Sequence, residues 1–149
     1  MKRLALLLLS VTLTLLTPVI AQDEEETETT ITSDNFKLDL AEKQGVFSGK
    51  VVVVHPRFEL KAEEIIVFFT DGNKISRMLA KGNVKIDQVD KSSESREAEY
   101  FVTDKKIILS GNPVVMQGEN QVSGNTITLF PDSDKMEVEG RSKVQFFLE

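Results

Sequence analysis

Few residues in this chain have the types and spacing that metal or cofactor chemistry requires. His55 is the only histidine and cysteine is absent, so the ligand sets typical of zinc are missing. The segment "PDSDK" (131–135) holds two aspartates. Asp and Ser in such a turn usually bond to their own backbone, which leaves weak calcium binding as the less favoured alternative. We therefore predict no metal and no cofactor, and we assign His55 no role.

Carboxylates are frequent, but their pattern does not indicate catalysis. Glycan hydrolysis generally needs two carboxylates that flank the reacting bond. The acidic residues between positions 87 and 99 fall mostly on the expected outer face or in loops. The sequence also lacks Gly-x-Ser-x-Gly and Ser-x-x-Lys. We therefore predict that the protein is not an enzyme, with a β-stacked glycan enzyme as the least favoured alternative.

Charge and cysteine content narrow the class of partner. The 149 residues have a formal net charge of −6, and the charge becomes more negative if the N-terminal Lys2 and Arg3 are removed. Nucleic acid is an unsuitable partner because phosphate binding needs a basic surface. Without cysteine there is no disulfide framework, so packing and strand pairing must stabilise the fold.

The N-terminal segment has the pattern of an export signal. A basic start is followed by a mainly apolar run over positions 4–16 and by "TPVIA" (17–21). This pattern predicts a signal peptide over residues 1–21, cleaved after Ala21, and hence an exported protein. A retained anchor is the alternative. Residues 22–30 are acidic and lack apolar positions, which predicts a flexible leader before a domain over residues 31–149.

The mature sequence repeats a glycine motif. The four copies are "VFSGKVVVV" (46–54), "LAKGNVKI" (79–86), "ILSGNPVV" (108–115) and "VEGRSKVQF" (138–146). Their glycines, Gly49, Gly82, Gly111 and Gly140, are separated by about 30 positions each time. Each glycine interrupts apolar strand sequence, so we expect a bend there, and Pro113 follows such a bend.

A second motif keeps the same register. "ITSDNFKLDL", "LKAEEIIVF", "SESREAEYFV" and "VSGNTITLF" carry the small residues Ser33, Ala62, Ser95 and Gly124. After each of these, the apolar spacing shifts as it does at a β-bulge. The extra residues of the longer interval fall around "TDGNK" (70–74), which is turn sequence. Two motifs in one register indicate a repeated structural unit rather than chance.

Apolar residues alternate within each copy, which is strand spacing. We therefore predict an all-β fold of about four stacked rungs of short antiparallel strands, open at both ends. The inner face would carry columns of apolar residues: Val51, Val53, Leu60, Ala62, Ile65, Val67, Val84, Ile86, Ala98, Tyr100, Val115, Val122, Ile127 and Leu129.

The two ends of this stack lack a capping helix in the sequence. An uncapped sheet leaves strand edges that can pair with another chain. The C-terminal "KVQFFLE" is too apolar to leave in water, although fraying is the alternative for any terminus. We predict an end-to-end oligomer interface at Thr30, Ile31, Thr32, Val144, Phe146, Phe147 and Leu148.

The order and spacing of these segments resemble the OstA-like repeats of the LptA family of periplasmic lipopolysaccharide-transport proteins. The resemblance covers residues 30 to about 147. It implies a twisted OstA-like β-jellyroll whose apolar groove shelters the acyl chains of lipid A. It further implies end-to-end stacking of copies that links an LptC-like inner-membrane protein to an LptD-like outer-membrane barrel.

The resemblance also implies which residues face the lipid. Family positions correspond by register to Ile31, Ile86, Tyr100 and Val102. Joined with inner-face residues, the expected lipid-binding set is Ile31, Phe36, Leu38, Val51, Val53, Val67, Ile86, Tyr100, Val102 and Leu129. From the residues alone, the same columns could form only a closed core.

Two other functions are also compatible with the sequence. An LptC-like partner would keep residues 1–21 as a membrane anchor, and the size of the mature protein distinguishes it. A β-stack scaffold would polymerise without lipid, and lipid that co-purifies with the protein would exclude it.

Overall fold

The computed structural model describes residues 28–148. The predicted signal peptide, positions 22–27 of the leader and Glu149 lie outside these residues. The described chain is all-β, as predicted, and within it no helix is long and apolar enough to cross a membrane. The strands are β1 (Thr30–Thr32), β2 (Asn35–Asp39), β3 (Gln44–His55), β4 (Phe58–Phe69), β5 (Ile75–Asp87), β6 (Ser92–Phe101), β7 (Lys106–Ser110), β8 (Val114–Gln117), β9 (Asn120–Ser123), β10 (Thr126–Phe130), β11 (Lys135–Glu139) and β12 (Lys143–Gln145).

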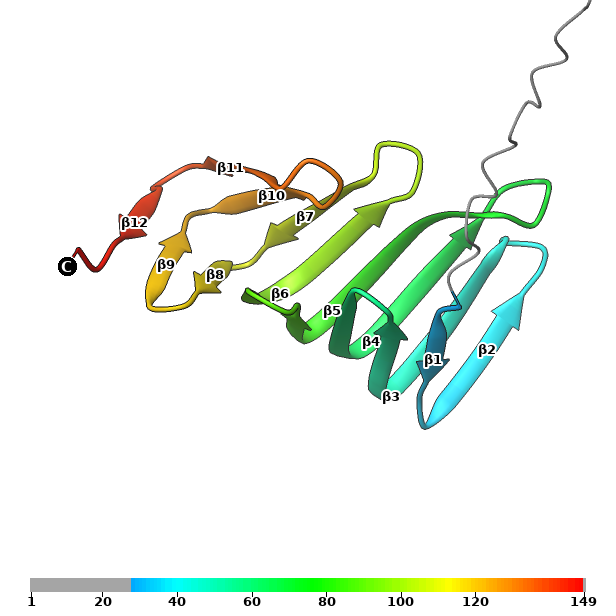
Figure 1. Cartoon of the computed structure of the whole chain (residues 1–149). Coiled ribbons are helices and arrows are strands. Elements are labelled where there is room, and N and C mark those ends of the chain that lie inside the picture. The colour runs from blue at the N-terminus through cyan, green and yellow to red at the C-terminus, as the bar shows by residue number, and fades with distance from the viewer. Residues whose placement is uncertain (1–27, 149) are drawn as a thin grey trace, which may run out of the picture.

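All twelve strands belong to one antiparallel sheet. The main path runs β1-β3-β4-β5-β6-β7-β10-β11, while β2 pairs with β3, β8 with β6 and β9, and β12 with β9. The strands follow one another along a single axis, so β1 and β2 lie at one end of the molecule and β11 and β12 at the other (Figure 1). This arrangement is the predicted stack of strands, with the N-terminal strands at one end and the C-terminal strands at the other.

The sheet is folded into two facing walls because each long strand changes partners along its length. β3, for example, pairs with β2 near its start and with β1 near its end. The first wall comprises β2, β7, β10, β11 and residues 44–48, 64–69, 75–81 and 97–101 of the long strands. The second wall comprises β1, β8, β9, β12 and residues 51–55, 58–62, 84–87 and 92–95.

The walls meet at corners formed by the repeated glycines, as the sequence predicts. Gly82 and Asn83 both have positive φ, 79° and 45°, and the β5–β6 register shifts between Lys81 and Val84. The same pair of positive φ values recurs at Gly49, Gly111 and Gly140 with the residue that follows each of them. A left-handed residue of this kind re-aims the strand, and glycine adopts it without strain.

The second repeated motif supplies the other half of each corner. The residues that follow its small positions are Asp34, Glu63, Arg96 and Asn125. Asp34 N–H donates a hydrogen bond to Gly49 O at 2.8 Å, and Asn125 N–H donates one to Gly140 O at 2.7 Å. The two motifs keep one register because each glycine lies directly against a residue of the second motif.

The apolar core lies between the walls and contains the predicted columns. Its fully buried members are Val51, Val53, Ala62, Ile65, Val67, Ala80, Val84, Ile86, Ala98, Leu109, Val115 and Ile127. Ten of these belong to the predicted inner face, and Ala80 and Leu109 extend it. Buried Ser95 donates its hydroxyl proton to Glu97 O at 2.9 Å, so its polar atom is satisfied.

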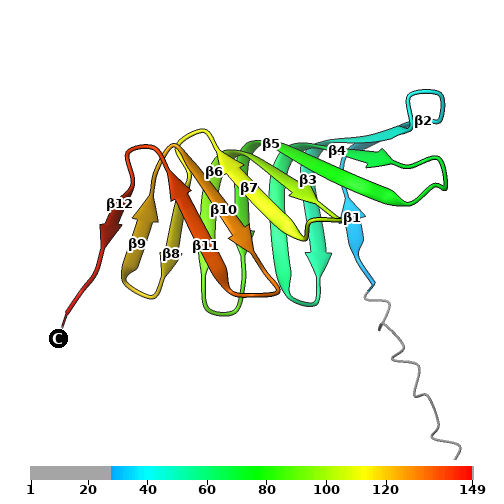
Figure 2. The ribbon, with the colours of Figure 1, turned by 90° about the horizontal axis from the view of Figure 1, so that it is seen from above.

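Figure 2 shows the strands following one another from β1 and β2 at one end to β12 at the other. Their cross-strand register aligns the inner side chains into columns along this direction. Paired residues of neighbouring strands share a face of the sheet. One column of the first wall is Leu38, Gly45, Val67, Met78, Tyr100, Ile107, Leu129 and Met136. One column of the second wall is Ile31, Val53, Leu60, Ile86, Ser93, Val115, Val122 and Val144.

Candidate functional site

A groove lies between the two walls and opens on the side away from the corners. It contains two adjoining cavities of about 390 and 380 Å³. Ile86, Gln88, Ile107 and Pro131 line both cavities, so the two are neighbouring parts of one groove. Each volume falls within the range typical of small-molecule sites in proteins. We call the open side, where the hairpin turns of the two walls face each other, the mouth.

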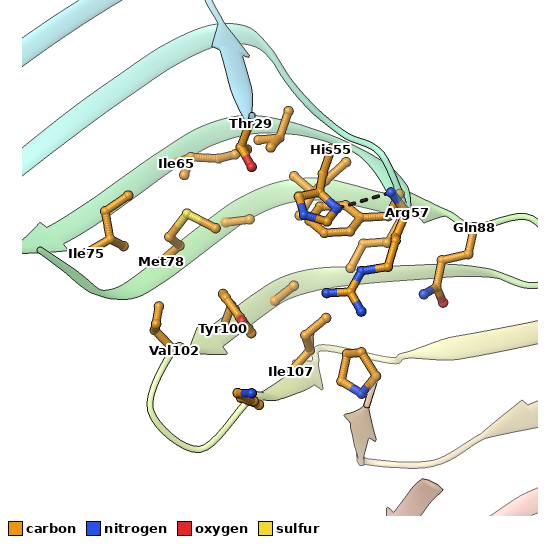
Figure 3. Close-up of a pocket in the computed structure, with 18 of the residues that line it drawn as sticks. Thr29, His55, Arg57, Ile65, Ile75, Met78, Gln88, Tyr100, Val102 and Ile107 are labelled. Atoms are coloured by element: carbon orange, nitrogen blue, oxygen red, sulfur yellow. Dashed lines mark hydrogen bonds between the residues drawn. The ribbon is translucent and has the colours of Figure 1, made fainter. Parts of the chain in front are cut away.

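The first cavity is apolar over most of its depth (Figure 3). The second wall contributes Ile31, Phe58 and Leu60, and the first wall contributes Met78, Tyr100 and Ile107. Strand alternation turns these side chains inward and turns their neighbours along the strand outward. Glu99, next to Tyr100, and Lys85, next to the inner residue Ile86, therefore lie on the outer face. The interior therefore suits an extended apolar ligand.

The structure brings together six of the ten residues predicted to bind lipid. Ile31, Val53, Tyr100 and Val102 line the first cavity, Leu129 lines the second, and Ile86 lines both. Val51 and Val67 are fully buried in the core and line neither cavity.

Phe36 and Leu38 also lie outside the cavities, at the end of the groove. Their partners in the ladder are Phe47 and Gly45, which face inward, so these two side chains share the inner face. They are nevertheless 55% and 49% exposed, because β2 is an edge strand of the described chain. The inner face of the first wall thus continues past the part that the second wall covers.

Sequence reasoning missed Met78 and Ile107, which line the centre of the groove. The signal was present, since each lies two positions before a buried inner residue, Ala80 or Leu109. Extending the strand alternation by one step assigns both to the inner face. The charged residues of the first cavity, Arg57, Lys105 and Asp132, had no comparable signal in the sequence, because they lie in turns.

His55 contributes to the cavity wall, although no role was predicted for it. Its ring stacks on Phe58 with 4.7 Å between centroids, and its Nδ1 accepts a hydrogen bond from the Arg57 N–H at 3.1 Å. Burial lowers the pKa of His55 below its usual 6.5, and the charge of Arg57 lowers it further. The imidazole is therefore neutral at pH 7 and adds no cation to the groove.

Both ends of the molecule carry apolar side chains that nothing in residues 28–148 covers. At the C-terminal end, Val144, Phe146, Phe147 and Leu148 are exposed, and β12 pairs only with β9 among the described strands. At the N-terminal end, β1 pairs only with β3 within the same range. The predicted interface residues therefore lie on strands at opposite ends, or just after them.

The described part of the chain holds no cluster of side chains that could bind a metal ion. No group of three or more His, Asp or Glu side chains in residues 28–148 is placed to hold a metal ion. What these residues offer instead is an apolar groove and uncovered strand edges.

Comparison with known proteins gives a family and a fold. The family model described as "LptA/(LptD N-terminal domain) LPS transport protein" matches residues 30–135. The crystal structure of LptH, "the LptA homologous periplasmic component" of the lipopolysaccharide transport device of Pseudomonas aeruginosa, is similar with a TM-score of 0.75 and 17% identity. The alignment covers 83% of this chain and 97% of that one, and at this identity it concerns the fold. No curated protein sequence matches this chain.

Proposed function

Since the chain belongs to the LptA/LptD N-terminal-domain family of lipopolysaccharide transport proteins, we propose that it is a periplasmic carrier that shelters lipid A acyl chains in its groove. The family is one of transport proteins rather than of enzymes. The observation that carries the proposal is the apolar groove between the walls, whose inner columns run from one end of the molecule to the other.

The energetics of such a groove fit passive shelter. Burying an acyl chain is worth about 0.8 kcal/mol per CH₂, so even partial cover of several chains gives useful binding. Both cavities have mainly apolar linings and share Ile86 and Ile107, so a chain that slides from the first cavity to the second stays on apolar surface. Direction of transport must then come from other components.

We further propose that copies stack end to end and bridge the two membranes. In the second wall, Ile31 of β1 and Val144 of β12 belong to the same inner column. Docking of β12 onto β1 of another copy would therefore continue both the sheet and the apolar column. LptC-like and LptD-like proteins would bind the two terminal edges in the same way.

The domain organisation belongs to the same proposal. Residues 1–21 act as a cleaved signal peptide, 22–30 as an acidic leader, and 31–149 as the β-jellyroll domain. The mass of the mature protein tests the first of these assignments, because an LptC-like anchored protein would retain residues 1–21.

Photo-crosslinking in the native envelope tests the carrier function. We expect a probe at Ile86, which lines both cavities, to form an adduct with lipopolysaccharide. A probe at Lys85 should form none, because this neighbour points to the outer face and is paired with Lys61 and Glu94. Equal adducts at the two positions would contradict groove binding, and no adduct at either would favour the scaffold function.

Truncation tests the stacking. Deletion of residues 144–149 should weaken self-association, because it removes exposed apolar side chains and most of the β12 edge. The β signal in circular dichroism should stay largely intact, since the longer strands are untouched. Unchanged sedimentation velocity profiles would count against end-to-end docking through β12.

A matched pair of point variants controls for surface hydrophobicity in this experiment. Val144→Asp changes an exposed apolar residue on the terminal strand, and Val89→Asp changes one in the β5–β6 turn. Only Val144→Asp should shift the sedimentation profile toward monomer. Equal shifts would mean that general stickiness, rather than this edge, drives association.

A further inference from the structure

The turn between β10 and β11 places a carboxylate between two cations at the mouth. Asp132 Oδ1 lies 3.7 Å from Arg57 Nη1, and Asp132 Oδ2 lies 3.3 Å from Lys105 Nζ. Arg57 belongs to the β3–β4 turn of the second wall, whereas Lys105 belongs to the β6–β7 turn of the first wall. One oxyanion therefore joins the two walls across the opening of the groove.

A second contact joins the β10–β11 turn to the second wall. Asp134 accepts a hydrogen bond from Lys91 Nζ at 3.3 Å, and Lys91 belongs to the β5–β6 turn of the second wall. This contact does not involve Arg57 or Lys105. The turn would thus stay in place if Asp132 gave up its two partners.

The three charged groups lie where the polar end of an amphiphile would have to be. Arg57, Lys105 and Asp132 all line the first cavity, and its deeper surface is apolar. In Figure 3 the Arg57 guanidinium points into the opening, across from Ile107. A ligand whose acyl chain fills the cavity must leave its polar group at this position.

The sign of the local charge at this position is opposite to the net charge of the whole protein. The whole chain has a net charge of −6. The charged residues that line the first cavity are two cations and one anion, and His55 in the same lining is neutral at pH 7. The lining of the first cavity is therefore positive on an acidic protein, because it holds one more cation than Asp132 neutralises.

We propose that Arg57 and Lys105 bind a phosphate, or a similar oxyanion, on the head of an acylated amphiphile, and that Asp132 holds this place in the free protein. The inference deepens the proposed carrier function and depends on it. Exposed ion pairs such as these are weak, and a phosphate carries more charge than a carboxylate. Arginine also suits the planar, two-point binding of phosphate oxygens. The phosphate therefore displaces Asp132 while the acyl chain occupies the groove.

The test compares two lipids with the same acyl chains, diphosphoryl lipid A and its fully dephosphorylated form. The double variant Arg57→Gln/Lys105→Gln should bind the phosphorylated lipid about five- to thirtyfold more weakly than the wild type and the dephosphorylated lipid equally well. The difference should shrink at high salt because the contact is exposed. Asp132→Asn should bind the phosphorylated lipid more tightly, because the internal competitor is gone.

A control variant removes the same charge elsewhere. Lys61→Gln/Lys85→Gln removes two exposed lysines that are paired on the outer face of the second wall. This variant should bind both lipids as the wild type does. Thermal unfolding of every variant confirms that the fold persists.

The outcomes separate the two proposals. If the wild type binds neither lipid, both the carrier function and this inference are overturned. If it binds both lipids equally and the Arg57/Lys105 variant matches it, only the inference is overturned. Inorganic phosphate alone serves as a competitor, and millimolar phosphate that binds without lipid would identify a free-anion site instead of a headgroup site.

Discussion

Replacing Gly82 with alanine should lower the free energy of unfolding by about 2–4 kcal/mol, since a left-handed residue other than glycine costs about 1–3 kcal/mol before any clash. Gly82 has a φ of 79°, and an added Cβ would lie 2.8 Å from the Cβ of Glu63. That atom is next to the backbone of β4, so the corner itself must shift. Urea denaturation followed by circular dichroism measures the loss.

Two other glycines separate the causes of this loss. Gly118 also has a positive φ, 59°, but an added Cβ would meet nothing within 4 Å. Gly118→Ala should therefore show the backbone cost alone. Gly72 lies in a turn without a positive φ, and an added Cβ would meet only Thr70 Oγ1 at 3.8 Å, an ordinary contact. Gly72→Ala should therefore change stability little. If Gly82→Ala were as mild as Gly118→Ala, the close contact at the corner would not be what requires glycine there.

These corners explain why much of the fold could be predicted from sequence. Each corner requires a glycine in one strand and, in the neighbouring strand, a small residue just before the residue that contacts this glycine. Both requirements are local, so each leaves a residue type at a fixed position. Strand alternation is equally local, and it assigned the inner face correctly at Val84, Ala98 and Ile127, which are buried.

Strand alternation does not predict how deep in the groove an inward-facing side chain lies. Val51 and Val53 both point inward, but Val51 lies next to the Gly49 corner, where the walls converge and pack. Val53 lies further toward the mouth and lines the first cavity. Their residue types are identical, so only the separation of the walls decides which one can meet a ligand.

Contacts between the two walls across the mouth likewise could not be predicted from a sequence pattern. Asp132 lies in a segment that reads as an ordinary polar turn, and this holds for Arg57 as well. Their approach depends on the curvature accumulated over the strands between them. The two charges therefore become a candidate site only once the walls are placed.

Placing a carboxylate at Tyr100 should reduce lipid A binding at least tenfold. Tyr100 lies at the centre of the inner column between Met78 and Ile107, and it lines the first cavity. An acyl chain in the groove would strip water from an aspartate at this position, and burying an unpaired polar group costs about 1–3 kcal/mol, more when it is charged. Since about 1.4 kcal/mol corresponds to a factor of ten, the affinity loss exceeds one decade.

The neighbouring aromatic residue provides the matched control for Tyr100→Asp. Phe101 is half-buried like Tyr100, but it lies on the outer face between Arg77 and Lys106. Phe101→Asp removes a similar aromatic side chain and adds the same charge, which the two cations there can accept. Fluorescent lipid A titration should show near-normal binding for Phe101→Asp. Equal losses in the two variants would place the lipid outside the groove, because only the inner residue can report on a chain between the walls.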